Sequence, residues 1–160
     1  MSRRPEMEAA AHVLVVTDRP AATPALLDAI HGRAARGPAW FQLLVPNPAA
    51  AEWHPGHPER HERVEEVERE LIRALPLMEE AAGRPVEGSV STRHDPMDAI
   101  EEALNSEDYD EIILSSVPHR LSSWLHVDLP HRVAHLGLPV TTITSQPGIG
   151  TRERNSNSRV

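Results

Sequence analysis

The sequence predicts a single α/β domain with three layers, α/β/α, in which helices cover both faces of a five-stranded parallel sheet. Five short apolar runs, rich in β-branched residues, alternate along the chain with stretches whose apolar residues recur every three or four positions. The short runs are apolar almost throughout, which is typical of parallel strands that are buried on both faces. A length of 160 residues suits one such domain.

The predicted strands are bounded by proline, glycine and polar residues. We place them at His12–Thr17, Trp40–Pro46, Pro85–Ser91, Asp110–Ser116 and Leu138–Thr144. Open parallel sheets bind ligands at the carboxyl ends of their strands. We therefore look for a site at residues 17–20, 45–47, 91–94 and 115–132.

The predicted helices have recognisable first and last residues. Thr23 and Pro24 suit the N-cap and first position of a helix that Gly37 ends. Asp95 and Pro96 are suited in the same way to begin a helix before the fourth strand. A further short helix is predicted over residues 130–135.

A long helix is predicted over residues 59–82. Its apolar residues, which form one stripe, are Val64, Val67, Leu71, Leu75, Met78 and Ala82. Pro76 falls inside this helix. Because proline lacks a backbone N–H and its ring clashes with the preceding turn, we expect Pro76 to kink or split the helix.

Composition narrows the class of protein. The formal charge of −8 argues against a nucleic-acid partner. The absence of cysteine excludes disulfides, thiolate metal sites and cysteine nucleophiles, and fits a cytoplasmic location. The apolar run near the N-terminus is too short for a signal peptide or a membrane span. We expect a flexible N-terminus over residues 1–10, one domain over 11–145 and a disordered tail over 146–160.

Four segments, in order, resemble the universal stress protein family. They are "HVLVVTD" (12–18), "HDPMDAIEEAL" (94–104), "YDEIILSS" (109–116) and "GLPVTTI" (137–143). The stretch "WLHVDLPHRV" (124–133) is most similar to short, divergent members of the family found in actinobacteria. The resemblance implies the strand order 3-2-1-4-5. It also implies a homodimer through the edge formed by the last strand, Pro139 to Thr144, unless loops cover that edge.

Many members of this family bind ATP through the motif Gly-x2-Gly-x9-Gly-Ser/Thr after the fourth strand. Its four positions fall here on Ser115, Pro118, Asp128 and Leu129, and no glycine occurs between residues 88 and 137. Pro118 has no N–H to donate, and Asp128 would repel a phosphate. We therefore expect ATP binding in the family's manner to be lost. No cofactor is expected, and ATP or AMP is disfavoured.

The resemblance nevertheless preserves half of a nucleotide site. Asp18 matches the family's aspartate near the nucleoside, and the backbone at about Val45 matches the group that contacts the base. The alternative is that Asp18 stabilises only the turn before Pro20.

The segment from Ser115 to Arg132 could hold an anion in a remodelled way. Its candidate ligand-binding residues are Ser115, Ser116, Arg120, Asp128, His131 and Arg132. Arginine suits phosphate geometry. Alternatively, Asp128 caps the following helix or pairs with an arginine, and the segment serves only to bury its apolar residues.

A second histidine-rich run contains His54, His57 and His61. Three imidazoles could bind zinc or nickel, but proline and glycine in the run favour an exposed loop. Serines near histidines lack the Gly-x-Ser-x-Gly turn of hydrolases, so no catalytic residue is assigned.

The sequence thus predicts a non-enzymatic stress-response or regulatory protein that acts through an unidentified protein partner. The first alternative is a binder of a nucleotide or another small anion at the carboxyl ends of the strands. An adenine-nucleotide hydrolase is the second alternative.

Overall fold

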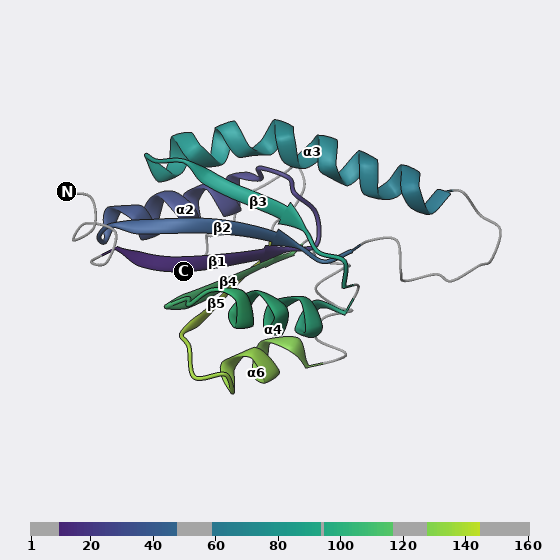
Figure 1. Ribbon diagram of the computed structural model, residues 1–160. Coiled ribbons are helices and arrows are strands. Elements are labelled where there is room, and N and C mark those ends of the chain that lie inside the picture. Colours follow the sequence, from purple (N-terminus) through teal and green to yellow (C-terminus); the bar gives the residue numbers. More distant parts are fainter. Residues whose placement is uncertain (1–9, 48–58, 94, 117–127, 145–160) are drawn as a thin grey trace, which may run out of the picture.

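A computed structural model of the chain describes residues 10–47, 59–93, 95–116 and 128–144, with the backbone alone over 59–63. Its elements are β1 (Ala11–Thr17), α2 (Pro24–Ala35), β2 (Ala39–Val45), α3 (Glu59–Ala82), β3 (Val86–Val90), α4 (Pro96–Ser106), β4 (Glu111–Ser116), α6 (Leu129–Ala134) and β5 (Val140–Thr144). The strands form one parallel sheet of five, in the order β3-β2-β1-β4-β5. Helices α2 and α3 cover one face, and α4 and α6 lie on the other (Figure 1). The predicted fold class and strand order are confirmed.

Strand β1 is the centre of the sheet and separates two apolar cores. It pairs with β2 on one side and with β4 on the other. Val13 and Val15 belong to the core beneath α2 and α3, whereas Leu14 and Val16 belong to the core beneath α4 and α6. This division explains why the strand is apolar at successive positions rather than at alternate ones.

Helices α2 and α4 begin with side-chain caps, as the sequence predicts. The Thr23 hydroxyl accepts a hydrogen bond from Leu26 N–H at 3.3 Å. The Asp95 carboxylate accepts from the N–H groups of Met97 (2.8 Å) and Asp98 (3.4 Å). These bonds satisfy donors that the first turn of a helix cannot satisfy by itself.

Helix α3 is a single element of 24 residues that continues through Pro76. The predicted split does not occur. Pro76 is exposed, while Ala74 and Met78 on either side of it are buried in the core against the sheet. Tertiary contacts therefore hold the helix together where its local sequence opposes it.

Helix α6 begins one residue earlier than predicted, at Leu129. Asp128 occupies the N-cap position with φ 54°, in the left-handed region, and its side chain makes no capping hydrogen bond. Asp128 therefore occupies the predicted cap position, but its side chain does not cap the helix. Glycine adopts this left-handed conformation more readily than other residues do. Asp128 also matches the third glycine of the motif in the family that the sequence resembles.

Some predictions fall outside the described residues. These are the loop over 48–58, residues 117–127 of the segment from Ser115 to Arg132, and the N-terminal and C-terminal tails. Within the described ranges, no helix has the length and apolarity that a membrane crossing requires.

Candidate functional site

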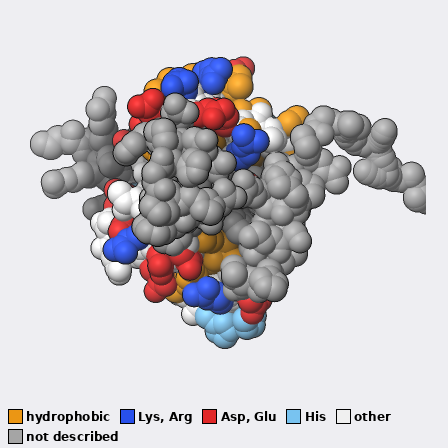
Figure 2. Space-filling view, turned by 90° about the vertical axis from the view of Figure 1, so that its right-hand side faces the viewer, with side chains coloured by type: hydrophobic (Ala, Val, Ile, Leu, Met, Phe, Trp, Pro, Cys, Tyr) orange, Lys and Arg blue, Asp and Glu red, His pale blue; other side chains and the backbone are white. Residues whose placement is uncertain are grey.

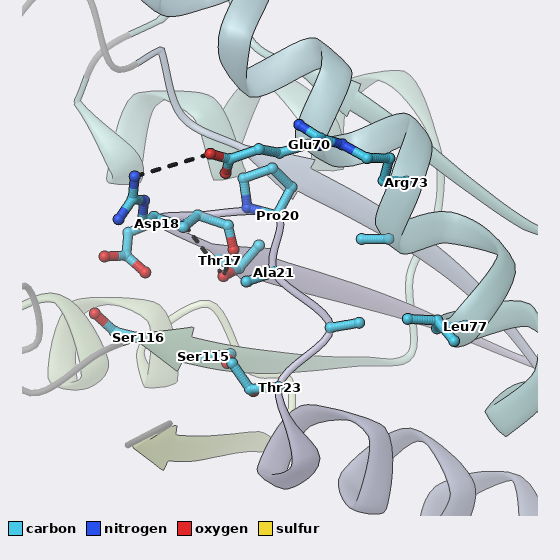
Figure 3. A pocket seen from close by; sticks show the side chains of 13 residues that line it. Thr17, Asp18, Pro20, Ala21, Thr23, Glu70, Arg73, Leu77, Ser115 and Ser116 are labelled. Atoms are coloured by element: carbon cyan, nitrogen blue, oxygen red, sulfur yellow. Dashed lines mark hydrogen bonds and ion pairs between the residues drawn. The ribbon is translucent and has the colours of Figure 1, made fainter. Parts of the chain in front are cut away.

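A cavity of about 470 Å³ lies at the carboxyl ends of β1 and β4, beneath α3. Its lining consists of Thr17, Asp18, Arg19, Pro20, Ala21, Ala22, Thr23, Glu70, Arg73, Ala74, Leu77, Ser115 and Ser116. Figure 3 shows the strand-end residues Asp18, Ser115 and Ser116 on one side and the α3 residues Glu70, Arg73 and Leu77 on the other. The loop from β1 to α2 runs between these two sides.

Local hydrogen bonds shape that loop. The Thr17 hydroxyl donates to the carbonyl of Arg19 at 2.6 Å and accepts from Arg19 N–H at 3.3 Å. Ala21 N–H donates to the same carbonyl at 2.8 Å. Thr17 is buried, and so is Pro20, whose ring fixes the backbone angle φ. The floor of the cavity is therefore preformed.

The strand side of the cavity is polar. Thr17 and Ser115 are register partners in the β1–β4 pair, which brings Asp18 close to Ser116. Ser115 is 2% exposed and Ser116 is 1% exposed, whereas Asp18 is half-buried. A carboxylate accepts hydrogen bonds, and a hydroxyl both donates and accepts them. This side therefore suits a ligand that carries hydroxyl groups.

The α3 side combines charges of both signs with apolar surface. A long ion pair of 3.9 Å joins the Arg19 guanidinium to the Glu70 carboxylate across the cavity (Figure 3). Arg73 lies one turn beyond Glu70, and Leu77 follows one turn later. Two arginines balance Asp18 and Glu70, so the charged residues of the lining sum to zero.

The structure brings together three of the residues that the sequence singled out: Asp18, Ser115 and Ser116. Val45 is fully buried, and its carbonyl accepts Ser91 N–H at 2.8 Å. It is not part of the cavity lining.

The remaining candidates lie elsewhere. Asp128, His131 and Arg132 are exposed on and beside α6, on the opposite face of the sheet from α3. Arg120 is outside the described residues. The proposed cluster of anion ligands around α6 is therefore not part of this cavity.

The predicted strand-end range 17–20 includes Arg19, whereas Glu70 and Arg73 were not predicted from the sequence. Glu70 and Arg73 belong to the charged face of α3, and helical periodicity alone predicts that such a face is exposed to solvent. Their contribution depends on how α3 passes over the end of β1, which no local pattern encodes. Arg19 follows Asp18 directly, and its position beside a strand end was the one available signal.

The predicted histidine metal site cannot be placed. His54 and His57 are outside the described residues, and the side chain of His61 is not described. Among the described side chains, no three potential metal ligands gather at one point.

A second hollow, of about 350 Å³, lies over β2 and β3 beside α4. Its lining includes Glu87, Glu102, Glu107 and Tyr109. The pKa of the Tyr109 phenol is raised to about 12. Burial is the largest cause, followed by the charge of Glu107, a hydrogen bond with Glu107 and the charge of Glu87.

Tyr109 gives the protein a defined response to alkali. The pKa is raised on folding, so the folded state keeps the phenolic proton longer than the unfolded state. We expect stability to be unaffected by Tyr109 below about pH 10 and to fall as the pH rises from about 10 to about 12. The chain has one tyrosine, no cysteine and no lysine, so tyrosinate absorbance follows this group alone. In Tyr109→Phe, this loss of stability should disappear.

Figure 2 is a space-filling view toward the carboxyl ends of the strands, and acidic and arginine side chains lie around the described part of this face. Comparison with known proteins adds no identity to this geometry. No family model matches the chain, and no curated protein matches it.

Proposed function

We propose that this protein is a non-enzymatic regulatory protein of the universal-stress type that binds a small ligand in the cavity at the ends of β1 and β4. The ligand carries hydroxyl groups and one anionic group, and a nucleoside monophosphate such as AMP has this chemistry. The observation that carries the proposal is the convergence of Asp18, Ser115 and Ser116 with two arginines around one cavity. Its volume falls within the range of about 300–1,000 Å³ that is usual for small-molecule sites.

Each part of such a ligand has a complement in the lining. Asp18 can accept hydrogen bonds from ribose hydroxyls, and Ser115 and Ser116 can donate or accept further bonds. Arg19 and Arg73 can contact one phosphate, because the planar guanidinium group can donate two hydrogen bonds to a pair of phosphate oxygens. Apolar surface for the base comes from the alanines and Leu77.

A triphosphate fits the site less well. The charges of the lining already balance, so several phosphate charges would have too few cations to meet them. Leu129, at the family motif's hydroxyl position, is fully buried in the core beneath α4 and α6 and cannot reach a phosphate. We therefore expect AMP to bind more tightly than ATP.

We place catalysis second. The described lining residues include no imidazole or thiol. A hydrolase at this cavity would have to use Asp18 or Glu70 as the base for water and an arginine to stabilise the leaving group.

The proposal is tested by thermal unfolding with ATP, AMP and cyclic AMP, each with and without magnesium. AMP at a hundredfold its dissociation constant should stabilise the protein by about 2.7 kcal/mol, with a smaller effect of ATP at equal concentration. Absence of stabilisation by all three would contradict nucleotide binding. Release of phosphate above background would favour the hydrolase instead.

We further propose that two copies of the chain pair through β5. This strand lies at the edge of the sheet, carries no charge or proline, and exposes Thr141, Thr142 and Thr144. Ile112 N–H donates a hydrogen bond to the Pro139 carbonyl, so the backbone groups of Pro139 face β4. Successive residues of a strand point their backbone groups to opposite sides, so the N–H of Thr142 points away from β4. Such an edge can pair with another chain.

Light scattering should therefore give about twice the monomer mass of 17.7 kDa. Thr142→Pro, which removes an outward N–H, should shift the protein toward monomer, while Thr142→Ala should leave the mass unchanged. A monomeric wild type at micromolar concentration would contradict the pairing.

A further inference from the structure

Two histidine rings meet at the surface beside the end of α6. The Nε2 atoms of His131 and His135 are 2.9 Å apart, and the ring centroids are 4.4 Å apart with an interplanar angle of 83°. Both side chains are exposed. Figure 2 shows histidine side chains gathered at one place on this surface, at the bottom of the view.

The backbone beneath this pair is held in place. His135 N–H donates to the His131 carbonyl at 3.2 Å, so the two residues are one helical turn apart, as i and i+4. On the opposite side of the turn, Leu129 and Val133 are fully buried in the core. The two imidazoles therefore project from a fixed turn, and only their exposed rings need to rotate.

The spacing of the two nitrogens is close to that of a chelating pair. Metal–imidazole bonds are about 2.0–2.1 Å long. At that length, two nitrogens 2.9 Å apart subtend an angle of about 90° at a shared metal, which is the angle between neighbouring ligands in square-planar or tetragonal coordination. A tetrahedral ion would need the nitrogens to lie about 3.3–3.4 Å apart.

We propose that His131 and His135 form a bidentate site for a divalent transition-metal ion, with preference for Cu²⁺ over Zn²⁺. Both Nε2 atoms donate lone pairs to the ion, and the ring protons reside on the Nδ1 atoms. Water completes the coordination. The preference for Cu²⁺ follows from the general order of affinity of nitrogen sites for divalent ions, in which Cu²⁺ stands highest. Mg²⁺ and Ca²⁺, which require oxygen ligands, are not bound.

This site is separate from the cavity at the ends of β1 and β4 and does not depend on the function proposed for it. It is also distinct from the run His54, His57 and His61, so the test must resolve individual histidines. We therefore choose the full chain with ¹⁵N-labelled imidazoles, titrated with substoichiometric Cu²⁺ and followed by nuclear magnetic resonance. Paramagnetic broadening should appear first at His131 and His135.

Calorimetry with Cu²⁺ and with Ni²⁺ supplies the affinity. His131→Ala and His135→Ala should each weaken the tightest binding step by about tenfold or more, since each removes one of two ligands. His31→Ala is the matched control, because His31 is an exposed histidine on α2 with no partner ring among the described residues. It should leave the affinity unchanged. Circular dichroism verifies that each variant is folded.

Two outcomes would overturn the proposal. One is first broadening at other histidines while His131 and His135 stay sharp. The other is unchanged affinity in both alanine variants, which would mean that the 2.9 Å contact is only a hydrogen bond between two imidazoles.

Discussion

Replacement of Gly88 by valine is expected to lower the free energy of unfolding by about 3 kcal/mol. Gly88 lies in β3 where α3 crosses closely over the sheet. A Cβ atom at this position would lie 2.9 Å from Leu71 Cδ1, 3.2 Å from Leu75 Cδ2 and 3.4 Å from Leu43 Cβ. The two methyl groups of valine would then have to displace the core stripe of α3. Gly88→Ala should cost less, about 1 kcal/mol, because the ends of the leucines can move.

Gly32→Ala is the matched control for this prediction. Gly32 lies on the exposed side of α2, and an added Cβ would meet no atom within 4 Å. This substitution should raise stability by about 1 kcal/mol, because alanine favours the helix over glycine. Urea unfolding followed by circular dichroism measures all three variants. Stability of Gly88→Val within about 0.5 kcal/mol of wild type would contradict the close approach of α3 to β3.

Replacement of Asp18 by alanine is expected to weaken the binding of AMP by about 10- to 100-fold. Hydrogen bonds to a charged group contribute about 1.5–3 kcal/mol each, and every 1.4 kcal/mol is a factor of ten in affinity. Asp18→Asn should retain part of the affinity, because the amide oxygen still accepts. Isothermal titration calorimetry measures the dissociation constants.

Asp28→Ala serves as the control, because Asp28 is an exposed aspartate on α2 outside the cavity lining. It keeps the net charge equal to that of Asp18→Ala, so a general electrostatic effect would weaken both variants alike. Asp18 also interacts within the protein, so unfolding is measured in parallel. Unchanged AMP affinity in a folded Asp18→Ala protein would place the ligand elsewhere.

The fold was predictable because its signals are local and agree with one another. Thr23 and Asp95 indicate the starts of two helices, and the apolar run of β1 indicates a buried strand. All three features are found in the structure. The sequence also predicts a kink or a split at Pro76, and the split does not occur. In the folded protein, burial of Ala74 and Met78 outweighs the hydrogen bond that Pro76 cannot make.

The site was predictable only in part. The rule for parallel sheets leads to Asp18, Ser115 and Ser116, because these residues follow strand ends. It cannot reveal Glu70 and Arg73, since their place depends on the path of α3 over the sheet. The left-handed backbone of Asp128 is equally invisible to sequence, because aspartate enters that region only in particular turns.

The cavity at the ends of β1 and β4 is the ligand site that we propose. The most direct measurement is the map of backbone amide shifts in ¹H–¹⁵N spectra as AMP is added to the labelled chain. We expect saturable shifts concentrated in residues 17–23, 70–77 and 115–116, and their loss in Asp18→Ala. Absence of shifts at saturating AMP, or shifts concentrated on α6 or over β2 and β3, would contradict it.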